Sequence, residues 1–158
     1  MSTPKLIVMN KERARRYSYQ RHAQTSVIIS IRDNNEEIIH FYRGASNGIM
    51  AICHTAFDDV EAGASQYQPI TQNDAAVIAE FVEKWWDKVD TVIVHCGAGI
   101  SRSAGCAAAI AKFFTGDDSF IFGDPKYHPN MTVYRAVYTQ LMHNQAVREE
   151  STPDGNGE

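Results

Sequence analysis

Two kinds of apolar pattern alternate along the chain, and they predict an alternation of strands and helices. Short runs rich in valine and isoleucine, bounded by polar residues, predict strands at 5–9, 26–31, 37–42, 49–54 and 91–94. Apolar residues at helical spacing, together with one segment of small residues, predict helices at 11–16, 71–88, 104–111 and 128–142. The run at 91–94 is almost entirely apolar, which is typical of a central strand covered on both faces.

Polar residues mark where these elements begin and turn. Asn10 is a good cap for the first helix, and Thr71 with Asp74 predicts a capping box for the second. The polar segment at 33–36 predicts a turn, after which Glu37 to Tyr42 returns as a second strand. This order of elements predicts an α/β fold: a three-layer sandwich with a mixed, twisted central sheet of about four to five strands and helices on both faces.

The length of 158 residues fits one domain, which we place at 1–148, and the polar residues 149–158 predict a disordered tail. The three cysteines have no metal-ligand spacing and no secretory signal before them, so we expect a reduced, cytoplasmic protein without a metal. No apolar run reaches the roughly 18 residues that would span a membrane. The net charge of −4 argues against nucleic-acid binding.

The candidate chemistry lies in one stretch, His-Cys-Gly-Ala-Gly-Ile-Ser-Arg-Ser at 95–103, between the most apolar strand and the small-residue helix. Five residues separate Cys96 from Arg102, enough for the backbone to curl around a tetrahedral dianion with its N–H groups inward. Gly97 and Gly99 permit the unusual dihedrals of such a curl, and the following helix N-terminus favours negative charge. The predicted phosphate-binding residues are Gly97, Ala98, Gly99, Ile100, Ser101 and Arg102.

The same surroundings favour nucleophilic chemistry at Cys96. A cysteine at a helix N-terminus beside arginine readily forms the thiolate, which can attack phosphorus. Arg102 offers a planar fork that matches two phosphate oxygens. Ser103 could donate a hydrogen bond to the sulfur when it leaves, and His95 is expected to orient the loop. The alternative is a structural cysteine in a tight strand-to-helix turn.

Competing motifs are incomplete in this stretch. It lacks the third glycine of a dinucleotide fingerprint, the Gly-Lys-Ser/Thr of a nucleotide-binding loop and the closing glycine of a hydrolase elbow. The pattern His-Cys, five residues, then Arg-Ser instead resembles the active-site loop of the cysteine-dependent protein tyrosine phosphatases. Gly-Ile-Ser-Arg-Ser is most similar to their compact dual-specificity branch.

The resemblance implies a phosphomonoesterase that acts on a phosphorylated protein or peptide through a cysteinyl-phosphate, without cofactor or metal. The reaction needs a carboxylic acid that protonates the leaving oxygen and then acts as base on water. In similar enzymes this acid is an aspartate on a loop ahead of the cysteine, and Phe-x-Asp-Val here points to Asp59 over Asp58. By the same resemblance Asn130 supports the catalytic loop, although it also fits a helix cap.

Other interpretations stay open at this point. The loop would equally suit a module that binds phosphate with little turnover, a phosphatase of a non-protein phosphoester, or thiol redox chemistry of the arsenate-reductase kind. Phosphoinositides are disfavoured because the loop has no lysine. Cys53 fits either core packing or a redox partner of Cys96. The segment 11–21, with five cationic residues and one acidic residue, is either a solvated helix face or a surface that steers acidic phosphopeptides.

Overall fold

The computed structural model describes residues 3–44, 46–61, 63 and 66–151. This part of the chain forms four strands, β1 (Lys5–Asn10), β2 (Ser26–Arg32), β3 (Ile49–Ala56) and β4 (Thr91–Cys96). It also forms five helices, α1 (Lys11–Ser18), α2 (Gln72–Trp85), α3 (Arg102–Thr115), α4 (Ser119–Phe122) and α5 (Met131–Ser151). The Asn10 cap of α1 and the Thr71–Asp74 capping box of α2 are both present, as predicted.

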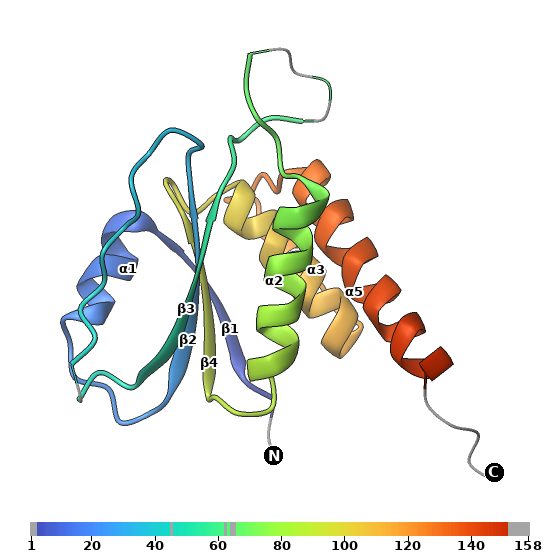
Figure 1. The fold of residues 1–158 in the computed structure, drawn as a ribbon. Coiled ribbons are helices and arrows are strands. Elements are labelled where there is room, and N and C mark those ends of the chain that lie inside the picture. Colours follow the sequence, from blue (N-terminus) through green and yellow to red (C-terminus); the bar gives the residue numbers. More distant parts are fainter. Residues whose placement is uncertain (1–2, 45, 62, 64–65, 152–158) are drawn as a thin grey trace, which may run out of the picture.

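The strands form one sheet in the order β1-β4-β2-β3, with α1 on one face and α2, α3 and α5 on the other (Figure 1). Because both faces are covered, there are two apolar cores. The larger core joins the sheet to the three helices, and the smaller one joins it to α1 through residues such as Ala14 and Ile93. The α/β class is confirmed.

The sheet is parallel throughout, so the prediction of a mixed sheet is wrong. That prediction relied on a strand at Glu37 to Tyr42, and this segment forms no strand. A return strand would have to pair with β2, but β2 already has β4 and β3 on its two sides. The segment instead crosses from β2 to β3 over the face that α1 covers, burying Ile39 and packing Phe41 against the smaller core.

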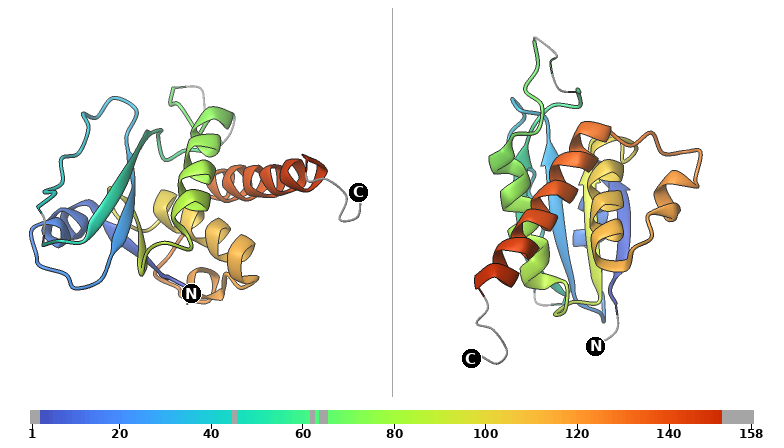
Figure 2. Two further views of the ribbon diagram at one scale, coloured as in Figure 1. Left: turned by 60° about the horizontal axis from the view of Figure 1, so that its bottom comes forward. Right: turned by 90° about the vertical axis from the view of Figure 1, so that its right-hand side faces the viewer.

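Helix α3 is buried along its first ten residues, from Arg102 to Ala111. Its small side chains allow close packing, with β1 and β4 on one side and α5 on another. Helix α5 in turn packs against both α2 and α3 (Figure 2). The start of α3, where the loop that begins at Cys96 ends, is therefore held firmly in the protein.

Two segments differ from the sequence prediction near the C-terminus. The connection at 119–127, expected to be irregular, contains the short helix α4. Helix α5 continues to Ser151, so the predicted tail does not begin at 149. In the last turns of this helix, Arg148 pairs with Glu83 of α2 at 3.0 Å. The predicted tail residues 152–158 lie outside the described part. No helix within the described ranges has the length and apolarity needed to cross a bilayer.

The contact between α3 and the start of α5 depends on Gly105. A Cβ atom there would lie 2.5 Å from the carbonyl oxygen of Asn130. In an open helix, glycine to alanine usually stabilises by about 0.5–1 kcal/mol. Here we expect Gly105→Ala to lower the free energy of unfolding by about 1–3 kcal/mol, because two backbones must separate. Urea denaturation measures this, and an unchanged or raised stability would contradict the packing.

Candidate active site

The candidate loop runs from Cys96, the last residue of β4, to Arg102, the first residue of α3. The cysteine is only 2% exposed. Its Sγ accepts a hydrogen bond from the Gly99 N–H at 3.3 Å and lies 3.0 Å from Ser103 Oγ. These donors stabilise negative charge on the sulfur. The structure thus brings together Cys96 and Ser103 as the sequence analysis expected.

The loop turns carbonyl groups outward, toward neighbouring segments that donate to them. The three bonds are Lys11 N–H to Gly97 O at 3.1 Å, His128 N–H to Ile100 O at 3.0 Å, and Asn130 N–H to Ser101 O at 3.0 Å. In a trans peptide unit the next N–H points opposite to the carbonyl. The N–H groups of Ala98, Ser101 and Arg102 therefore point into the loop, which is the arrangement that binds an anion.

Gly99 lets the loop curl close to the junction of β1 and α1. Its φ angle is +71°, in the region that favours glycine. A Cβ atom here would lie 2.6 Å from the backbone nitrogen of Asn10. The loop is thus fitted against the start of α1 on one side, as it is fitted against the start of α5 on the other.

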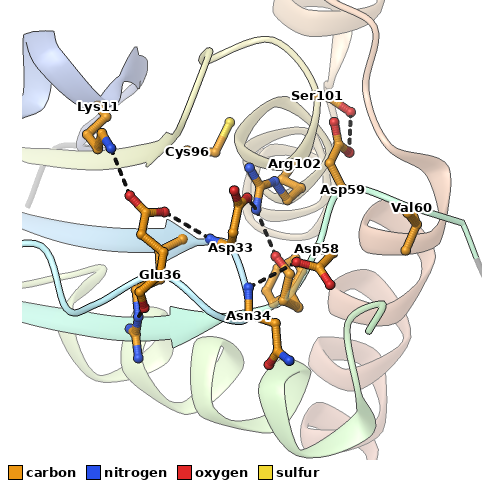
Figure 3. A network of polar contacts seen from close by, with 12 residues as sticks. Lys11, Asp33, Asn34, Glu36, Asp58, Asp59, Val60, Cys96, Ser101 and Arg102 are labelled. Atoms are coloured by element: carbon orange, nitrogen blue, oxygen red, sulfur yellow. Dashed lines mark hydrogen bonds and ion pairs between the residues drawn. The ribbon is translucent and has the colours of Figure 1, made fainter. Parts of the chain in front are cut away.

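Arg102 closes the loop with a guanidinium that is almost wholly buried (Figure 3). Its Nη1 donates to the carbonyl oxygen of Phe57 at 2.8 Å and lies 2.8 Å from Asp33 Oδ1. Its Nε is buried without a partner among the described residues. One nitrogen thus anchors the group, whereas the buried Nε still needs an acceptor.

The two neighbouring aspartates, of which the sequence favoured Asp59, face different partners (Figure 3). Asp59 Oδ1 accepts from Ser101 Oγ at 2.8 Å and from Asn130 Nδ2 at 2.9 Å, so its carboxyl group lies at the mouth of the loop. Asp58 accepts from the backbone N–H groups of Asn34 and Gln68, which lower its pKa. Asp58 thus ties two loops together.

His95 and Asn130 lie around the loop as expected of supporting residues. His95 is fully buried, with Nε2 2.7 Å from Ser30 Oγ and Nδ1 3.2 Å from Cys96 O. Burial lowers its pKa to about 4, so the ring is neutral near pH 7. Asn130 donates to Asp59, and its Oδ1 accepts from Val133 N–H. It therefore both caps α5 and contacts the candidate acid.

Sequence analysis missed the loop that follows β2, which contributes Asp33 to the site. Glu36 holds this loop by accepting from Lys11 Nζ at 2.7 Å and from Asp33 N–H at 3.1 Å. Burial opposes ionisation of Glu36, but these hydrogen bonds outweigh it and lower its pKa. The direction of the strands could have indicated this position. Asp33 follows the buried strand β2, which runs parallel to β4, so both strands end at the same edge of the sheet.

The surroundings of the loop suit a phosphoester substrate. A hollow of about 620 Å³ adjoins the loop and has Asp59, Ser101 and His128 in its lining. Such a space could take the part of a substrate beyond its phosphate group. Within the described ranges, no three His, Cys, Asp or Glu side chains gather where they could hold a metal ion.

Comparison with known proteins finds similarity in structure alone. No protein-family model and no curated protein matches the sequence. A structure of PTPMT1 in complex with PI(5)P has a TM-score of 0.53 and 14% identity, over 91% of this chain and 94% of that one. Another PTPMT1 structure has a TM-score of 0.51 and 16% identity, over 93% and 96%. Human tyrosine phosphatase-like serine/threonine/tyrosine-interacting protein has a TM-score of 0.48 and 21% identity, over 79% of each chain.

The two PTPMT1 likenesses extend over nearly the whole of both chains. The chain therefore shares the fold of PTPMT1. This agrees with the resemblance that the Cys96–Arg102 loop carries.

Neutral, buried His95 makes the stability depend on pH. The unfolded chain binds a proton on this ring near pH 6.5 and the folded chain only near pH 4, so stability is lost as pH falls through that window. We expect His95 to account for about 3 kcal/mol of the loss. Urea denaturation between these pH values should show a smaller loss for His95→Gln than for wild type. His143→Gln, on the exposed side of α5, is the control, and equal losses in wild type and His95→Gln would contradict this assignment.

Proposed function

We propose that this protein is a phosphomonoesterase of the protein-tyrosine or dual-specificity phosphatase type, which works through a cysteinyl-phosphate on Cys96. The observation that carries the proposal is the buried guanidinium of Arg102, which ends the loop that holds the Cys96 sulfur and whose Nε has no partner among the described residues. A dianionic phosphate group would satisfy this nitrogen and the inward N–H groups of Ala98, Ser101 and Arg102.

In the first step the Cys96 thiolate attacks phosphorus, so a sulfur–phosphorus bond forms and the phosphorus–oxygen bond to the leaving group breaks. Asp59 gives its proton to the leaving oxygen. Its Oδ1 already accepts two hydrogen bonds, from Ser101 and Asn130, so we assign the transferred proton to Oδ2. The leaving group departs as a neutral alcohol or phenol.

In the second step water attacks the cysteinyl-phosphate and Asp59, now a carboxylate, takes a proton from it. The phosphorus–sulfur bond breaks and the electron pair returns to Cys96. Ser103 Oγ, 3.0 Å from the sulfur, and the Gly99 N–H stabilise the returning thiolate. Phosphate leaves, and the chemistry requires no metal or cofactor.

The proposed substrate is a phosphorylated protein or peptide, and the proposed location is the cytoplasm. The loop has no lysine to meet further phosphate groups, which favours a substrate with one phosphate. Cys53, Cys96 and Cys106 are all free, which suits a reducing compartment. A phosphoinositide is the alternative substrate, because PTPMT1, which has a similar fold, has been seen in complex with PI(5)P. Both belong in a substrate assay.

The nucleophile can be tested with an aryl phosphate in EDTA and reductant. Wild type should turn it over without added metal, whereas Cys96→Ser should lower kcat on the order of 10³-fold or more, because the intermediate cannot form. Cys96→Ser should still bind phosphopeptide, since Arg102 and the loop amides remain. Phosphopeptide binding by wild type without any turnover would instead favour a binding module.

The acid can be tested with two neighbouring carboxylates of equal size. Asp59→Asn should lower kcat by roughly 10²- to 10⁴-fold with little change in KM, because an amide cannot donate the proton to the leaving group. It should also remove one limb of the pH profile of kcat. The matched control is Asp58→Asn, which changes the residue that binds Asn34 and Gln68. A larger kcat loss in the control would reverse the assignment.

A further inference from the structure

The proposed mechanism leaves the basic segment at 11–21 without a role. Lys11 pairs with Glu36, but none of the ion pairs among the described residues involves Arg13 or Arg16. Both arginines are exposed on α1. Because the chain as a whole carries a net charge of −4, this unpaired positive charge is a local feature.

The two arginines line a groove between α1 and β1. The groove has a volume of about 310 Å³ and is lined by Ile7, Met9, Arg13, Arg16, Tyr17 and Gln20. Ile7 and Tyr17, which are both half-buried, provide apolar surface, and the Tyr17 ring is held by stacking on His22, with 3.7 Å between the ring centroids. Strand β1 is an edge strand that pairs with β4 alone. The groove therefore combines apolar surface and two cationic groups beside an edge strand.

The groove begins close to the catalytic loop. In the ladder between β1 and β4, Asn10 lies opposite Cys96 and Met9 lies opposite His95. At a rise of about 3.3 Å per residue, the stretch of β1 from Asn10 back to Ile7 covers roughly 10 Å. An extended peptide with its phosphorylated residue in the loop would reach this stretch within about three to six residues.

We propose that this groove binds an acidic, extended segment of the phosphoprotein substrate, about three to six residues from the phosphorylated residue. The proposal rests on the proposed phosphatase function. Carboxylates of the segment would pair with Arg13 and Arg16, and an apolar side chain would pack on Ile7 and Tyr17. Helix α1 buries Ala14 and packs Tyr17 on the sheet, so it presents no apolar face to a bilayer. This favours a peptide over a membrane surface.

The test compares phosphopeptides of one length that carry either Glu or Gln three to six residues from the phosphotyrosine, on its N-terminal or C-terminal side. At low ionic strength wild type should have a kcat/KM about three- to tenfold higher for one Glu peptide than for its Gln counterpart. The double variant R13Q/R16Q should lose that preference and still hydrolyse a small aryl phosphate at the wild-type rate. The double variant K84Q/K88Q removes the same charge from the end of α2 and the turn that follows it, and should keep the preference.

Binding of the unphosphorylated Glu peptide, followed by NMR, reports the groove without catalysis. We expect chemical-shift changes at α1 and β1 in wild type and their loss in R13Q/R16Q.

Equal kcat/KM for Glu and Gln peptides, or an equal loss in both double variants, would overturn the docking proposal. Turnover of the aryl phosphate would in that case leave the phosphatase proposal standing. Vesicles of phosphatidylserine that retain wild type but not R13Q/R16Q, with no peptide preference, would overturn it in favour of a membrane surface. Peptide shifts without any hydrolysis would overturn the phosphatase function alone.

Discussion

The burial of one arginine constrains the arrangement of the whole site. A guanidinium keeps its charge at all ordinary pH values, and its removal from water is costly unless its donors are paired. Arg102 meets this requirement partly within the protein, through the Phe57 carbonyl and the Asp33 carboxylate. Its Nε has no such partner in the part of the chain that the structure describes. A phosphate oxygen would supply the missing acceptor. The burial of the Arg102 guanidinium therefore lowers the stability of the empty site and favours the binding of an anion there.

The partners of Arg102 are available because the sheet is parallel. Asp33 follows β2, Phe57 follows β3 and Cys96 ends β4, and these three strands are neighbours. Their C-terminal ends lie along one edge, which is where open parallel sheets bind ligands. β1 completes the set, since the Lys11 N–H that follows it holds the Gly97 carbonyl. Every strand thus supplies a group that positions the catalytic loop.

This topology explains which parts of the site could be predicted. The chemistry from His95 to Ser103 lies in consecutive residues, so its residue types and spacing suffice. Asp33 reaches the site only if β2 and β4 run parallel, and the expectation of a hairpin placed it in a turn instead. The apolar residues of the segment 37–42 supported that hairpin, but Ile39 is buried and Phe41 packs against the smaller core without forming a strand.

Adjacent aspartates show a second limit of sequence reasoning. Spacing cannot separate Asp58 from Asp59, because either lies at a suitable distance from Cys96 along the chain. In the fold they differ in their partners: Asp58 accepts backbone N–H groups of the loops that it joins, whereas Asp59 accepts from Ser101 and Asn130. Only the second arrangement depends on the catalytic loop. Two residues of the same type thus make different contacts in the fold, whereas the sequence favours Asp59 only through the resemblance of Phe-x-Asp-Val.

Helix α1 links the catalytic loop to the surface beside it. The backbone of its first residue fixes the Gly97 carbonyl, while the next two turns carry Arg13 and Arg16 along the groove. Because β1 and β4 are joined in register, the distance from Cys96 to this groove is set by a strand ladder. A ladder holds that distance far more rigidly than a loop would. A peptide segment that binds the groove would therefore approach the nucleophile in a defined register, and the energy of docking would contribute to the orientation of its phosphate group.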